Sequence, residues 1–166
     1  MMKRIKLVLI AMLIFLISGC GSVESSGDIF QYNDSYIGDN SAVGGMLRLL
    51  PGSEELDGFS LQTKSEPYGL TAQYSGRHSK EEQREALLYN ATFLFTLIHN
   101  AETVSADYSG KVISVTRDEL AAWYGEDIFR ASSEEELLDL ILPKLEDREQ
   151  VNEFFENQTG VNERDK

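Results

Sequence analysis

SKEEQREALLYNATFLFTLIHN, residues 79–100, decides the fold, because it is the most apolar stretch of the chain beyond its first 20 residues. Ser79 followed by Glu82 has the spacing of a capping box, with acidic side chains in the first turn of the predicted helix. The apolar residues behind it cover more than one helical stripe. We therefore expect a helix that is buried on most of its circumference and that ends near His99 and Asn100.

A pair of strands is predicted on each side of this helix. Residues 59–64 and 70–75 alternate between apolar and polar side chains, and a Glu-Pro-Tyr-Gly turn lies between them. Residues 102–107 and 111–116 form a second pair, joined through a Tyr-Ser-Gly turn. Each pair is typical of a β-hairpin with one buried and one solvated face.

Helices are predicted before the first hairpin and after the second. Asn40 or Ser41 can cap a first helix, which Pro51-Gly52 ends. Thr116 opens a short helix that closes at Gly125. Ser133 opens another helix, which Pro143 interrupts before a last, more polar helix.

The order α-β-β-α-β-β-α predicts an α+β fold. We expect a four-stranded, largely antiparallel sheet built from two hairpins, helices packed on one face, and extra C-terminal helices. The expected divisions are a signal peptide at 1–19, a flexible tether at 20–33, the α+β domain at 34–130, a helical C-terminal extension at 131–156 and a disordered tail at 157–166.

Several separated motifs carry a resemblance to a known family. They are YIGDNS at 36–41, a helix ending in LP at 50–51, LQT at 61–63, EPYGL at 66–70 and VTRDELAAWYG at 115–125. Together, over roughly residues 33 to 130, they resemble an uncharacterised domain family of exported Firmicute proteins, catalogued only as a domain of unknown function. The resemblance implies an extracytoplasmic domain, carried by some members on a lipoprotein and by others behind a transmembrane segment of a regulatory protein. It implies no catalytic residues.

The first 20 residues predict where the protein is located. A cationic start is followed by the apolar run 7–17 and by Ile17-Ser18-Gly19-Cys20, which has the pattern of a bacterial lipobox. Eleven apolar residues span only about 16 Å as a helix, too short for a bilayer core of roughly 30 Å. We expect cleavage between Gly19 and Cys20 and lipid on Cys20, which would hold the protein on the outer face of the cell membrane. The alternative is an uncleaved anchor with an incidental cysteine.

Charge narrows the choice of partners. The chain has 15 basic and 28 acidic side chains, and cleavage would also remove Lys3, Arg4 and Lys6. A domain this acidic is repelled by nucleic acid and by anionic headgroups. We expect no nucleic-acid partner, and contact with the membrane only through the lipid.

Catalytic and metal-binding patterns are missing from the sequence. Its two histidines, His78 and His99, do not have metal-ligand spacing, and no nucleophile motif is present. The single thiol is that of Cys20. We expect no enzymatic activity, no metal and no cofactor.

Two surfaces are candidates for binding. Tyr36, Asp39 and Asn40 form a polar loop at a helix start, which can bind a small ligand through free backbone N–H groups or can simply cap the helix. Trp123 can belong to an exposed aromatic patch for another envelope protein or to the core. The sequence therefore predicts a non-catalytic binding module, in envelope sensing; the alternative is a small envelope enzyme or hydrolase accessory protein.

Overall fold

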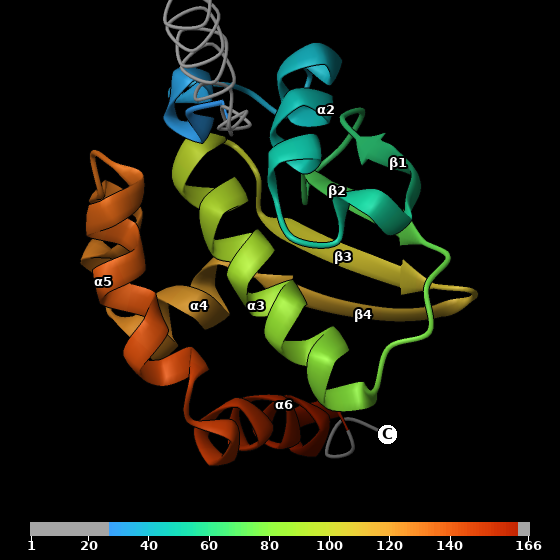
Figure 1. Ribbon diagram of the computed structural model, residues 1–166, viewed down its shortest axis with the longest axis vertical. Coiled ribbons are helices and arrows are strands. Elements are labelled where there is room, and N and C mark those ends of the chain that lie inside the picture. Colours follow the sequence, from blue (N-terminus) through green and yellow to red (C-terminus); the bar gives the residue numbers. More distant parts are fainter. Residues whose placement is uncertain (1–26, 163–166) are drawn as a thin grey trace, which may run out of the picture.

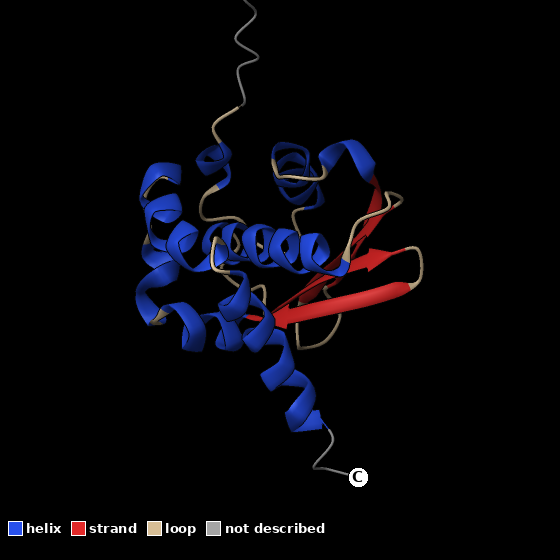
Figure 2. Ribbon diagram, turned by 60° about the horizontal axis from the view of Figure 1, so that its bottom comes forward, coloured by secondary structure: helices blue, strands red, loops and turns tan. Residues whose placement is uncertain are grey.

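Helix α3 (Lys80–Leu97) lies across one face of a four-stranded sheet, with the other helices around it (Figure 1). The computed structural model describes residues 27–162, so Gly19 and Cys20 lie outside the described part of the chain. The capping box of Ser79 and Glu82 at the start of α3 is present as predicted. The α+β class is confirmed. Strands and helices segregate, with the helices gathered largely to one side of the sheet (Figure 2).

The sheet contains β1 (Leu56–Gln62), β2 (Gly69–Tyr74), β3 (Thr103–Tyr108) and β4 (Lys111–Thr116), in that spatial order. Both predicted hairpins are antiparallel pairs. The central pair, β2 with β3, is parallel, which the sequence analysis does not anticipate. The reason is α3: a helix that follows β2 returns the chain to the edge where β2 began, so β3 enters in the same direction.

The N-terminal elements differ from prediction in two details. Helix α2 (Asn40–Leu49) is capped by Asp39 rather than by Asn40 or Ser41, because the Asp39 carboxylate accepts from two backbone N–H groups of the first turn. The 3₁₀ helix η2 (Ile29–Tyr32) lies in a stretch assigned to the tether. Since Ile29 is only 3% exposed and belongs to the core, this part of the stretch lies in the folded domain.

The C-terminal elements are α4 (Arg117–Tyr124), η4 (Glu126–Arg130), α5 (Glu134–Leu145) and α6 (Arg148–Asn162). Pro143 lies inside α5 and does not interrupt it; only two residues of the helix follow it, so the bond that its missing N–H cannot make belongs to the last turn. The break comes after Glu146, where the Asp147 carboxylate accepts from the first N–H groups of α6. Helix α6 continues beyond residue 156, into the predicted tail.

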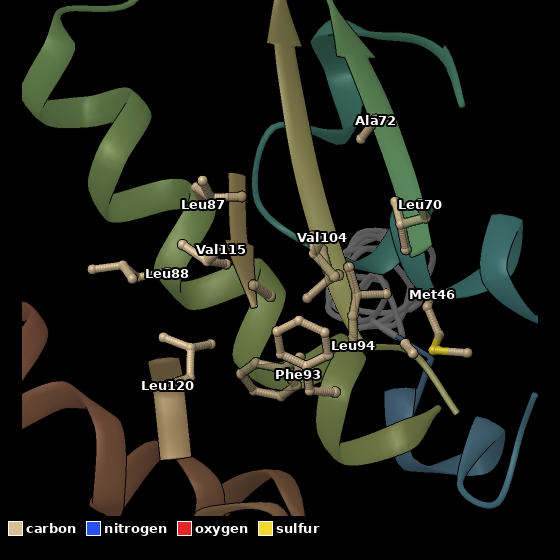
Figure 3. Close-up of a cluster of buried hydrophobic side chains, with 14 of the residues drawn as sticks. Met46, Leu70, Ala72, Leu87, Leu88, Phe93, Leu94, Val104, Val115 and Leu120 are labelled. Atoms are coloured by element: carbon tan, nitrogen blue, oxygen red, sulfur yellow. The ribbon is translucent and has the colours of Figure 1, made fainter. Parts of the chain in front are cut away.

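One hydrophobic core joins the matched strands and helices to α5 and α6. On the sheet side of α3, Leu87 and Leu94 lie against strand residues such as Val104, while Leu120 lies near Leu88 on another side (Figure 3). The extension 131–156 is therefore not a separate unit. It contributes the buried side chains of Leu137, Ile141, Leu145, Val151, Phe154 and Phe155.

Arg117 ties the end of α3 to the elements after it. Its guanidinium donates to the carbonyl oxygens of Ile98 at 2.6 Å and Ala101 at 2.8 Å. It also lies over the rings of Phe95 and Phe129, 5.2 and 4.9 Å from their centroids. Burial lowers the pKa of Arg117, but it stays charged because an arginine begins from so high a value. The loop after α3 is thereby held in one conformation.

A pair of substitutions on α5 tests whether the extension belongs to the core. Ile141 is 0% exposed and the neighbouring Leu140 is 49% exposed. Ile141→Ala should lower the free energy of unfolding by about 2–5 kcal/mol, and Leu140→Ala should change it by about 0.5 kcal/mol or less. Urea unfolding of the chain from Gly27 onward measures both. Equal effects would contradict a shared core.

Candidate ligand-binding site

The polar loop singled out from the sequence lies at the start of α2. The Asp39 carboxylate is occupied as the helix cap, and Asn40 is the first exposed residue of the helix. The backbone N–H of Ile37 is also used, since it donates to the Asn100 side chain at 2.8 Å. The groups expected to contact a ligand therefore already make capping and loop hydrogen bonds.

Tyr36 is 59% exposed and lies beside His99, with 5.9 Å between the ring centroids. The Nε2 of His99 is 2.6 Å from the Asp34 carboxylate. Asp34 has a φ of 63°, in the left-handed region that aspartate tolerates better than most residues. These three side chains form an exposed polar group beside the bridge between Ser35 and Ile98.

Trp123 is half-buried and packs against the extension. Its ring centroid is 5.1 Å from that of Phe154 on α6, and the Lys144 ammonium lies 5.4 Å from it. Lys144 also donates to the Trp123 carbonyl oxygen. Tyr36 contacts His99, whereas Trp123 contacts Phe154 and Lys144, so the two predicted surfaces have different neighbours within residues 27–162.

A third place, which the sequence analysis missed, has more of the features of a binding site. Tyr74 and Tyr108 end β2 and β3 and are partners in the parallel register. Their side chains therefore point to the same face of the sheet, and the rings stack with centroids 5.3 Å apart. His78 meets the Tyr108 ring edge-on at 5.9 Å. Together these side chains make one aromatic wall.

Asn90, on the side of α3 that faces this wall, is the chemically unusual residue. It is 5% exposed, and its Nδ2 donates to the Pro51 carbonyl oxygen at 3.0 Å and to the Tyr74 hydroxyl at 3.4 Å. Because the Pro51 oxygen can only accept, the nitrogen must be on that side and the orientation of the amide is fixed. Its Oδ1 is buried without a hydrogen-bond partner. Leaving a buried acceptor unpaired costs about 1–3 kcal/mol.

These residues line a cavity of about 310 Å³, a size typical of small-molecule sites. Glu55 and Glu82 stand at its rim, and no lysine or arginine lines it. Hydrogen bonds from the backbone and side chain of Ser79 lower the pKa of Glu82, which is therefore ionised at neutral pH. Burial raises the pKa of both tyrosines, that of Tyr108 to about 12, so both hydroxyls stay neutral. The lining is Pro51, Gly52, Glu55, Tyr74, His78, Glu82, Ala86, Asn90 and Tyr108.

This lining can bind a ligand, but it does not assemble a nucleophile with a base. Within residues 27–162, no three His, Cys, Asp or Glu side chains come together to hold a metal ion. In the same part of the chain, no helix has the length and apolarity to span a bilayer. The cavity offers aromatic faces and negative charge, which favour a ligand with N–H groups and positive charge.

The sequence contains one residue that could have indicated this cavity. Asn90 is a polar residue on the apolar part of a buried helix, where an amide needs a partner. The other lining residues come from β2, β3, α3, the segment between α2 and β1, and the loop between β2 and α3, and only the parallel pairing brings the two tyrosines together.

The fold and the cavity define a small α+β domain with a solvent-open hollow beside its central helix. The family model of a domain of unknown function, DUF4825, matches residues 29–116, more than half of the chain, and the chain therefore belongs to that family. No curated protein and no solved structure matches the chain significantly. Every residue that lines the cavity lies within the matched region.

The raised pKa of Tyr108 predicts how stability changes in alkali. The folded state keeps this hydroxyl protonated between pH 10 and about 12, while an unfolded tyrosine ionises near its ordinary value of 10.0. The resulting stabilisation is complete below pH 10 and is lost as the pH rises towards 12. Urea unfolding at about pH 9 and about pH 11.5 should show a smaller decrease for Tyr108→Phe than for the unmodified chain. An identical decrease would contradict the shift.

Proposed function

We propose that this protein is a lipid-anchored extracytoplasmic binding domain, and that its ligand presents a positively charged, N–H-donating group to the cavity at Tyr74 and Tyr108. The observation that carries the proposal is the lining itself, in which the carboxylates of Glu55 and Glu82 and the stacked rings of Tyr74 and Tyr108 meet at one cavity without a lysine or arginine. Carboxylates accept charge-assisted hydrogen bonds and aromatic faces attract cations, so an ammonium or guanidinium group fits both.

The charges around the cavity support a cationic ligand. Glu55 and Glu82 are placed to attract a cation, and the stacked rings of Tyr74 and Tyr108 present aromatic surface to it. An anionic ligand would meet two carboxylates with no lysine or arginine in the lining. Amines and guanidines are therefore the ligand chemistry that fits.

The position of the cavity agrees with a tether at the N-terminus. The chain enters the described structure at η2 and pairs through Ser35 with Ile98, just after the C-terminal end of α3. The residues of α3 that line the cavity, Glu82, Ala86 and Asn90, run from the first turn of the helix to its middle, and 18 residues of helix span about 27 Å. A lipid on Cys20 would thus leave the cavity at the end of the domain away from the membrane.

Small probes test the ligand chemistry. Saturation-transfer NMR on the chain from Gly27 onward, with n-butylammonium and methylguanidinium, should show binding, while n-butanol and butyrate should show little. Glu55→Gln should weaken the binding of both cations by about threefold to tenfold, because it removes one carboxylate without changing the shape of the side chain.

Glu54→Gln is the matched control, since Glu54 precedes Glu55 and does not line the cavity. Equal weakening by the two substitutions would show that only the general negative charge of the domain attracts the probes. Equal signals from the cations and from butyrate would contradict the proposal.

The anchor has a separate test. Mass spectrometry of the protein recovered from membranes should show loss of residues 1–19 and lipid on Cys20. Cys20→Ala should give an unlipidated precursor or a released protein, because the thiol is the attachment point and the chain has one cysteine. An intact Met1 with a free thiol at position 20 in the unmodified protein would contradict lipid anchoring.

A further inference from the structure

A second hollow adjoins the tyrosine cavity on the far side of the exposed ridge of α3. Its volume is about 300 Å³, and its surface is mainly apolar. Tyr89 lies on the α3 side, while Leu142 and Leu145 come from α5. Leu142 is 38% exposed, so it presents apolar surface to a ligand in this hollow. The extension outside the family match thus forms one wall of a hollow whose other wall is the family domain.

The two hollows meet at three shared residues, Pro51, Glu82 and Ala86. Ala86 is half-exposed and is the smallest side chain on this part of the helix surface. A bulkier side chain at this position would separate the two hollows, whereas the methyl group of alanine does not. One ligand can therefore occupy both hollows by crossing α3 at Ala86.

Charge and apolar surface alternate along this path. The tyrosine cavity has the carboxylate of Glu55 beside the rings of Tyr74 and Tyr108, and Glu82 is one of the residues that both hollows share. The second hollow has an apolar surface from Tyr89, Leu142 and Leu145, with Glu85 and Glu146 among its lining residues. A complementary ligand carries a cationic group next to an apolar group. The carboxylates of the protein along both hollows repel anionic ligands.

Accordingly, we propose that the joined hollows bind a peptide segment of another protein in which a lysine or arginine adjoins a large aliphatic or aromatic residue. The cationic side chain enters the tyrosine cavity and the apolar side chain packs on Leu142 and Tyr89. This inference rests on the proposed function, because it assigns the cation of the tyrosine cavity to a peptide. It also gives α5 a role in recognition, as the wall that selects the apolar neighbour.

A peptide fits this arrangement better than a small amine alone. Each hollow has about the volume that one or two side chains fill, and the two hollows share Pro51, Glu82 and Ala86 in their linings. An amine without an apolar neighbour would leave the exposed surface of Leu142 uncovered and would gain nothing from α5. Burying two or three methylenes of an aliphatic side chain strengthens binding by about tenfold or more.

An array of acetylated, amidated peptides tests the inference. Two adjacent positions take all common amino acids between Gly-Ser flanks, and the purified full-length chain in detergent is the binding partner. The unmodified chain should select peptides with Lys or Arg beside Leu, Ile or Phe, by about tenfold over peptides with Lys or Arg beside Gly. Absence of this joint preference would overturn the inference.

Two variants with a matched control locate the binding. Leu142→Ser should abolish the preference for the apolar neighbour and keep the preference for Lys or Arg. Leu140→Ser, on an exposed residue of the same helix that lines neither hollow, should keep both. Ala86→Gln, which adds bulk at the junction with a good helix former, should weaken the selected peptides by about tenfold. Equal effects of Leu142→Ser and Leu140→Ser would overturn the role of α5.

The two proposals fail in different ways. If n-butylammonium binds and depends on Glu55 but no peptide preference involves Leu142, the inference about the peptide is wrong and the proposed function stands. If neither the cations nor the peptides bind, both are wrong. Circular dichroism of each variant confirms that α5 and α3 remain folded, so that a loss of binding is a change in the surface.

Discussion

Burial of α3 on nearly all sides is the constraint on which the rest of the structure depends. A single sheet face covers only one side of a helix, so a helix that is apolar around its circumference needs other helices to complete its cover. Here the sheet takes the side of Leu87 and Leu94, and α4, α5 and α6 cover other sides. The extension therefore belongs to the same core, although the family match ends at residue 116.

The same helix also accounts for the cavity. It returns the chain from β2 to β3, which makes the central pair parallel and aligns Tyr74 with Tyr108 at the strand ends. Its polar residue Asn90 then faces those rings from above the sheet, with one amide atom paired and the other unpaired. Helix α5 packs beside α3, and the second hollow lies between α5 and the exposed side of α3. Fold and candidate site thus share one physical origin.

Local signals in the sequence predicted most elements well. The capping boxes of Ser79 and Thr116 and the alternation in both hairpins are present in the structure, because each depends on residues only a few positions apart. The predicted helix boundaries and caps were less accurate where they depended on tertiary packing. Pro143 is tolerated inside α5, and Asp39 rather than Asn40 caps α2. Tyr36 and Trp123, chosen for their chemistry, lie at separate places, the first exposed and the second against Phe154.

By itself, the sequence determined the class of fold, the helix that must be buried, the strand pairs and the membership in a family of unknown function, since these follow from periodicity, caps and motifs. Only the tertiary structure decided that β2 and β3 run parallel, that residues 131–156 complete the core, and that Asn90, Tyr74 and Tyr108 line one cavity. The physical reason is distance along the chain. Side chains 16 to 34 positions apart meet only after a crossover, and nothing in a local pattern records which faces will then lie opposite one another.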